Sequence, residues 1–188
     1  MTGAPAPTAA QTVGPFFGYA LPSPGGPELV PPTHRDAVRV HGRVLAGDGA
    51  PVPDALLEIW QAAPDGSTVT EPGSLRRDGW TFTGWGRAAT DDAGGYSFST
   101  LVPGASAPGR APFLALTVFA RGLLDRLLTR IYLPDTDPAP ESDPWLRTLQ
   151  PERRATLVAT RDSSGYLFDV VLQGERETVF LAHRPAPR

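Results

Sequence analysis

Residues 38–44 read Val-Arg-Val-His-Gly-Arg-Val, an alternation of small or apolar residues with basic ones. Successive side chains of a β-strand point to opposite faces, so the three valines and the glycine share one face and the basic side chains share the other. The segment 37–44 is therefore predicted to be a strand with one buried and one exposed face.

Similar patterns recur along the chain in short segments that are separated by turn residues. The turn Thr-Asp-Asp-Ala-Gly-Gly at 90–95 leads into an alternating segment, and Arg-Asp-Ser-Ser-Gly at 161–165 is the turn of a predicted hairpin. Strands this short and this frequent predict an all-β fold, an antiparallel β-sandwich. The predicted strands after the first are 55–61, 96–98, 113–120, 130–133, 155–160, 166–172 and 177–181.

Three local features refine this picture. Asp143-Pro144-Trp145 is typical of a helix start, with an N-cap followed by proline, so one short helix is predicted over 144–150. Residues 113–120 carry small or apolar side chains on both faces, which predicts a central strand covered on both sides. Tyr96 and Tyr166, at the starts of strands, are expected to pack their rings and keep their hydroxyls at the surface.

The composition favours one domain over residues 1–188. The chain has 22 Pro and 20 Gly, residues that concentrate in turns and strand edges. Its net charge of −3 argues against nucleic acid or an anionic membrane as partner. We see no apolar run of the roughly 20 residues needed to cross a bilayer, no signal peptide, and no cysteine for a disulfide or thiolate site. We therefore expect a cytoplasmic protein.

Residues 1–36 form an extended arm rich in Pro and Gly. Phe16, Phe17 and Tyr19 cluster in it between turn residues. A free tail gains nothing from three closely spaced aromatic residues, so we expect this part of the arm to dock on another surface.

The residues themselves predict no catalytic or metal centre. The three histidines, His34, His41 and His183, are too far apart in sequence to form a paired-ligand motif. The pair Asp91-Asp92 sits in a turn whose backbone needs such side chains as hydrogen-bond acceptors. Ser163-Ser164 is a hairpin turn with no histidine nearby in sequence, which gives no support to a hydrolase triad.

Several separated blocks of sequence resemble the intradiol ring-cleaving dioxygenases, and among them the alpha chains of the two-chain members. The resemblance runs from about Thr8 to Leu181, and its blocks occur in the family's order. They are Gln11–Phe16, Gly42–Val44, Gly49–Ala55, Ile59–Gln61, Thr90–Phe98, Phe119–Gly122, Thr129–Tyr132 and Gly174–Phe180.

This resemblance implies an aromatic-ring dioxygenase whose non-haem Fe(III) is held by two tyrosines and two histidines of a partner beta chain. Tyrosinate is a hard anionic donor that suits Fe(III). In this sequence the histidine positions fall at Phe113 and Ala115, and the tyrosine positions fall near Thr68 and Ser106. The resemblance thus implies a hetero-oligomer in which this chain has neither metal ligands nor catalytic residues. It also implies that the complex takes a small aromatic substrate and O2.

The resemblance also implies substrate-binding residues: Thr12, Gly14 and Pro15 of the arm would line a pocket shared with the beta chain. The same turn is equally interpretable as a docking turn. Arg121 follows the strand 113–120, and its planar guanidinium suits the carboxylate of a carboxylated catechol. Alternatively, Arg121 pairs with an Asp or Glu across the subunit interface.

Two other functions are open to this sequence. One is a stand-alone β-sandwich binding module of the carboxypeptidase-regulatory or transthyretin-like type. Such modules have a similar pattern of Gly, Pro and Asp-Gly-Tyr along the sequence. The other is an independent intradiol dioxygenase, which the absent iron ligands oppose. A neighbouring coding frame that carries the missing tyrosines and histidines would separate both from the subunit interpretation.

Overall fold

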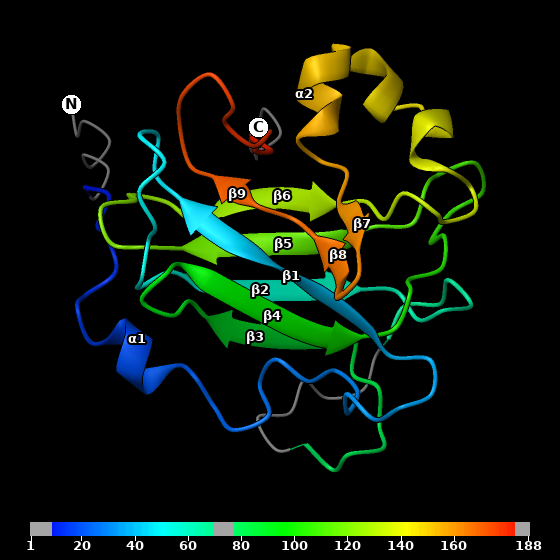
Figure 1. Cartoon of the computed structure of the whole chain (residues 1–188), viewed down its shortest axis with the longest axis horizontal. Coiled ribbons are helices and arrows are strands. Elements are labelled where there is room, and N and C mark those ends of the chain that lie inside the picture. Colours follow the sequence, from blue (N-terminus) through cyan, green and yellow to red (C-terminus); the bar gives the residue numbers. More distant parts are fainter. Residues whose placement is uncertain (1–8, 70–76, 183–188) are drawn as a thin grey trace, which may run out of the picture.

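The computed structural model describes residues 9–69 and 77–182, which form two stacked β-sheets (Figure 1). The first sheet has the order β4-β1-β8-β7, with β9 also paired to β1, and the second has the order β3-β2-β5-β6. The strands of the first sheet are β1 (Val38–Leu45), β4 (Gly95–Thr100), β7 (Thr160–Asp162), β8 (Gly165–Leu167) and β9 (Val170–Val171). Those of the second are β2 (Leu56–Gln61), β3 (Trp85–Ala89), β5 (Leu114–Phe119) and β6 (Leu127–Ile131). The predicted β-sandwich is confirmed.

The sandwich is not wholly antiparallel. β1 pairs parallel with both β8 and β9, while every pairing in the second sheet is antiparallel. A tight hairpin forces its two strands to be antiparallel, as in β7–β8. More than a hundred residues separate β1 from β8, so no turn sets their relative direction.

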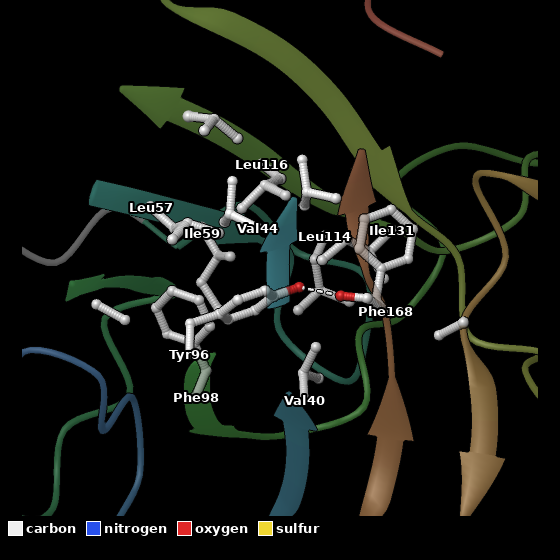
Figure 2. Packing of buried hydrophobic residues seen from close by; sticks show 14 of the residues in the cluster. Val40, Val44, Leu57, Ile59, Tyr96, Phe98, Leu114, Leu116, Ile131 and Phe168 are labelled. Atoms are coloured by element: carbon white, nitrogen blue, oxygen red, sulfur yellow. Dashed lines mark hydrogen bonds between the residues drawn. The ribbon is translucent and has the colours of Figure 1, made fainter. Parts of the chain in front are cut away.

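Alternating strand faces meet between the two sheets and form the core. In β1 the valines at 40 and 44 are fully buried, whereas Arg39 and Arg43 are exposed, as the alternation predicts. Tyr96 and Phe98 from β4 pack against Ile59, and the Tyr96 hydroxyl donates a 2.6 Å hydrogen bond to the Phe168 carbonyl (Figure 2).

The expected surface position of the two tyrosine hydroxyls is wrong. Tyr96 and Tyr166 are 5% and 2% exposed. Burial raises the pKa of Tyr96. Burial, followed by a hydrogen bond to Asp135, raises the pKa of Tyr166 to about 12. The inward alternation of their strands carries both rings into the core. The Tyr96 hydroxyl finds a buried carbonyl there, whereas the Tyr166 hydroxyl bonds to the half-exposed side chains of Asp135 and Arg161 at the edge of the core.

The short helices differ from the prediction for 144–150. A single 3-10 turn, η2, covers Leu146–Thr148, and a separate helix, α2, covers Pro151–Ala155. The expected cap is present, because Asp143 Oδ1 accepts hydrogen bonds from the N–H groups of residues 145 and 146. The chain has two more short elements, α1 (Phe17–Ala20) and the 3-10 helix η1 (Pro140–Ser142).

Two predicted strands in the C-terminal third are also wrong. Segment 155–160 begins in α2 and makes only an isolated bridge, Tyr132↔Val158, before β7 starts at Thr160. Segment 177–181 is not a strand, although the Thr178 N–H bonds to the Val171 carbonyl. The apolar alternation in these segments reflects their burial against the sandwich, which does not require a continuous ladder.

The arm lies partly on the domain's own surface. Leu29 and Val30 are buried, and the Leu29 N–H donates to the Ser99 carbonyl of β4. In contrast, Phe16, which precedes α1, and Tyr19, within α1, are 76% and 86% exposed. In the described part of the chain, no helix is long and apolar enough to cross a membrane.

Candidate functional site

The four positions that the resemblance assigns to iron ligands lie around one pocket, here called the Ala115 pocket. Thr68 and Ser106 come from loops, and Phe113 and Ala115 come from the start of β5, with β2 beside them. The pocket has a volume of about 190 Å³, and its other walls include Trp60, Gln61 and Gly104. The fold therefore brings together positions that the sequence places far apart.

The side chains of this pocket do not suit a ferric ion. Its walls offer two hydroxyls and one amide but no imidazole, phenol or carboxylate, whereas Fe(III) prefers hard anionic oxygen donors together with imidazole. Across residues 9–69 and 77–182, no group of three or more His, Cys, Asp or Glu side chains could hold a metal ion. The iron implied by the resemblance thus has no ligand set here.

Arg130 adds a positive charge beside this pocket. It pairs with Ala115 in the β5–β6 register, and its guanidinium carbon lies 4.1 Å from the centre of the Phe113 ring and 5.2 Å from that of Trp145. Its Nη1 donates to the Tyr132 hydroxyl at 3.1 Å. A fixed guanidinium next to the former ligand positions opposes a bound metal cation. The sequence pattern of residues 130–133 predicts only a strand, so the sequence did not identify Arg130 as a candidate functional residue.

The predicted substrate-binding residues gather at a second place, here called the arm hollow. Pro15 and Arg121 line the same hollow of about 400 Å³, together with aromatic residues of α1 and with Asp54. Thr12 joins them, because its hydroxyl accepts a 2.8 Å hydrogen bond from the N–H of Gly122. At Gly14, an added Cβ would meet nothing within 4 Å, so the chain's own packing does not require glycine there.

Arg121 already has an acidic partner within its own chain. Its Nε donates to the Asp54 carboxylate, and 60% of its side chain is exposed. Among the described residues its terminal nitrogens form no hydrogen bond or ion pair. The guanidinium can therefore hold Asp54 and still present two nitrogens to an incoming carboxylate.

The arm hollow and the Ala115 pocket lie toward opposite ends of the same strands. Ala115 is the second residue of β5, and Arg121 lies just past the end of β5, six residues after Ala115. At about 3.3 Å per residue, the two positions are roughly 20 Å apart. The predicted substrate-binding residues therefore do not face the chain's own former metal positions.

The other polar candidates are explained by structure. His41 pairs with Asp162 at 3.2 Å, and Asp91 accepts hydrogen bonds from the N–H groups of residues 93 and 95, as a turn residue does. His34 accepts a hydrogen bond from the N–H of Asp36. His183 lies outside the described residues.

Comparisons with known proteins agree with this geometry. The family model described as Dioxygenase matches residues 31–174. The chain is 38% identical to the protocatechuate 3,4-dioxygenase alpha chain of Burkholderia cepacia over 190 residues, which cover 92% of this chain and 95% of that one. It is 33% identical to the beta chain from the same species over 159 residues, which cover 76% of this chain and 67% of that one.

Among solved structures, the chain resembles the dioxygenase domain of a dioxygenase–carbohydrate-binding protein fusion from Streptomyces sp. SirexAA-E. The TM-score is 0.56 at 26% identity, and the match covers 90% of this chain and 99% of that domain. The sandwich, the converging ligand positions and these matches agree along most of the sequence. The chain belongs to the intradiol dioxygenase family.

Proposed function

We propose that this chain is the alpha subunit of a protocatechuate 3,4-dioxygenase and that it works only with an iron-bearing beta subunit. The family depends on non-haem iron. The Ala115 pocket has no donors for that iron, so the metal would belong to the beta chain. The reaction would add both atoms of O2 to protocatechuate and break the bond between its two hydroxyl-bearing carbons, giving 3-carboxy-cis,cis-muconate.

The observation that carries this proposal is the distance between the arm hollow and the Ala115 pocket. A substrate bound at Arg121 would be about 20 Å from this chain's own former ligand positions, by the rise of a strand. Catalysis requires the reacting atoms to lie within about 3.5 Å of one another. Arg121 can therefore contribute to ring cleavage only if another chain brings its metal centre to the arm hollow.

The similarity to both chain types supports such a pairing. The relatives that carry the names alpha chain and beta chain indicate a hetero-oligomeric dioxygenase. Residues 1–36 would dock on the beta chain, since Phe16 and Tyr19 stand exposed at the arm hollow. Large apolar side chains exposed together on a monomer are typical of an interface.

Each residue of the arm hollow would have its own role. Arg121 would bind the substrate carboxylate through its terminal nitrogens while Asp54 fixes its orientation. Thr12 would hold the arm against the end of β5, and Pro15 would form a pocket wall. Gly14 would let a partner chain or substrate approach the backbone closely, because nothing in the chain itself fills the space beside it.

The test is to co-express this chain with a candidate protocatechuate 3,4-dioxygenase beta chain and to follow O2 uptake and product formation with protocatechuate. We expect the two chains to co-purify, and we expect ring cleavage only from the pair. A chain that remains a well-behaved monomer and ignores the beta chain would instead favour the stand-alone binding module, which the family membership does not favour.

A further inference from the structure

We propose that the Ala115 pocket binds a single-ring aromatic carboxylate without a metal, with Arg130 as the group that recognises the carboxylate. The inference concerns this chain's own pocket and does not depend on the roles proposed for the arm hollow. It rests on the register of four strands, on the walls of the pocket and on the hydrogen bonds of Arg130.

The strand register builds the pocket. Trp85, Trp60, Ala115 and Arg130 form one row across β3, β2, β5 and β6. Side chains in such a row stand on the same face of the sheet, with neighbouring Cβ atoms about 5 Å apart. Ala115 is the one small side chain in the row, and it lines the pocket together with Trp60. Arg130 stands next to Ala115 in the row, on β6.

The walls and size of the pocket suit an aromatic ring. Trp60 is 55% exposed, and with Phe113 and Ala115 it supplies flat, apolar walls. The volume of about 190 Å³ is somewhat larger than the roughly 150 Å³ of an apolar protein cavity that binds benzene. It is below the usual range of about 300–1,000 Å³ for sites that take drug-sized ligands. The volume therefore suits a single substituted ring.

Arg130 supplies a positive charge that forms no ion pair with an acidic side chain of residues 9–69 or 77–182. In this part of the chain its only side-chain hydrogen bond is the one from Nη1 to the Tyr132 hydroxyl. The nearby Arg110 and Asp143 lie 3.7 Å apart and balance each other. The rings of Phe113 and Trp145 fix the guanidinium, so its free nitrogens can meet a carboxylate at little cost in side-chain entropy.

The polar walls select for ring substituents. Thr68 and Ser106 line the pocket, and neither hydroxyl bonds to another described side chain. Gln61, by contrast, is occupied, since it donates to the Leu101 carbonyl and accepts from Thr100. Hydroxyls in the walls can donate to or accept from a substituent, so they favour a ring that carries a hydroxyl as well as a carboxylate.

The experiment is calorimetric titration of benzoate into the complex of this chain with its beta subunit, with benzamide as the neutral counterpart. Benzoate should bind saturably and more tightly than benzamide. Arg130→Gln should raise the dissociation constant at least about tenfold, the effect of losing roughly 1.4 kcal/mol. Ala115→Leu keeps every charge but fills the pocket and should abolish this binding. Binding to the wild type should also change the fluorescence of Trp60, and Trp60→Phe should remove that change.

Two further variants locate the binding. Arg147→Gln removes an exposed charge elsewhere and should leave the affinity unchanged, and Arg121→Gln should leave this binding in place. The proposal is overturned if Ala115→Leu binds benzoate as the wild type does, if benzamide binds equally well, or if no saturable binding occurs. Binding that disappears in Arg121→Gln but persists in Arg130→Gln would place benzoate in the arm hollow. That result would overturn this inference while supporting the proposed shared site. Thermal melting checks that each variant is folded.

Discussion

At the level of single residues, Arg121 in the turn after β5 and Arg130 in β6 have opposite surroundings. Arg121 is mostly exposed and bonded to Asp54, whereas Arg130 lies between two aromatic rings with no acidic partner among the described residues. A guanidinium at a protein surface can contact a partner chain, bind a substrate or simply be solvated by water. Only the neighbours, which come from distant segments, distinguish these roles.

Truncating Arg121 tests the role proposed for it. Arg121→Ala removes charge-assisted hydrogen bonds worth about 1.5 to 3 kcal/mol, so kcat/KM for protocatechuate should fall roughly ten- to hundredfold. Catechol, which lacks the carboxylate, should lose much less. The measurement is steady-state kinetics on the reconstituted complex, with iron content and oligomer size measured in parallel.

Two controls make this result specific. Arg126→Ala removes an exposed arginine of the following loop and should be neutral. Asp54→Asn breaks the internal ion pair but keeps the cation, so it should cost less than Arg121→Ala. Equal losses for both substrates would mean that Arg121 acts on the ring chemistry or the interface and not on the carboxylate.

At the level of secondary-structure elements, the sequence predicts what is local. Strand β1 follows from alternation, and the N-cap at Asp143 follows from its neighbours. Turn chemistry places the β7–β8 hairpin in the right region, but β7 (Thr160–Asp162) lies mostly in the predicted turn 161–165. The parallel pairing of β1 with β8, the helix α2 and the irregular path of 177–181 depend on contacts with distant segments. Local propensity carries no information about such contacts.

The residues of the candidate site also fall into two groups, those that could be identified from the sequence and those that only the structure reveals. Phe113 and Ala115 could be singled out because a family resemblance assigned a role to their positions, and Thr12 and Arg121 likewise. The cation at Arg130 could not, because its place beside Ala115 depends on the β5–β6 register. A residue that meets its functional neighbours only through the pairing of two strands gives no local signal in the sequence.

The cap at Asp143 should be important for stability. Its carboxylate is 1% exposed and accepts hydrogen bonds from the N–H groups of Ala111, Trp145 and Leu146. Asp143→Ala leaves these donors unpaired and should lower the free energy of unfolding by about 2 to 4 kcal/mol. Urea denaturation measures this loss. Asp92→Ala, at an exposed turn position, is the matched control and should change stability very little.

The contact of β8 with Asp135 should weaken at high pH. The pKa of Tyr166 is raised from 10.0 to about 12, so folding favours its neutral form. The stability gained from this group is complete below about pH 10 and is lost as the pH rises toward 12. The difference in unfolding free energy between the wild type and Tyr166→Phe should therefore shrink over this range. A difference that stays constant to pH 12 would contradict the raised pKa.

At the level of the whole molecule, the chain has the β-sandwich of the intradiol dioxygenases, and within residues 9–69 and 77–182 no cluster of His, Cys, Asp or Glu side chains could hold a metal ion. Its exposed aromatic residues Phe16 and Tyr19 stand at the arm hollow, about 20 Å from the Ala115 pocket along the strands. Both features have one explanation if a second chain supplies the metal and covers the arm.

The arm should therefore control assembly. Replacing Phe16 and Tyr19 together by serine removes two large apolar contacts, so the complex should dissociate more readily and ring-cleavage activity should depend on protein concentration. Sedimentation velocity over a dilution series measures this. Trp80, which is 91% exposed and lies outside the arm, gives the control variant Trp80→Ser. If the double variant assembles as well as the wild type, the arm is not part of the interface.

The most direct test of the proposed division of labour is elemental analysis of iron in the chain alone and in the reconstituted complex. Because Thr68, Ser106, Phe113 and Ala115 offer no ferric ligand set, the chain alone should be colourless and free of iron. The complex should contain one iron for each pair of alpha and beta chains and show the colour of tyrosinate bound to Fe(III). Stoichiometric iron in the purified single chain, or two irons in each pair, would contradict the account.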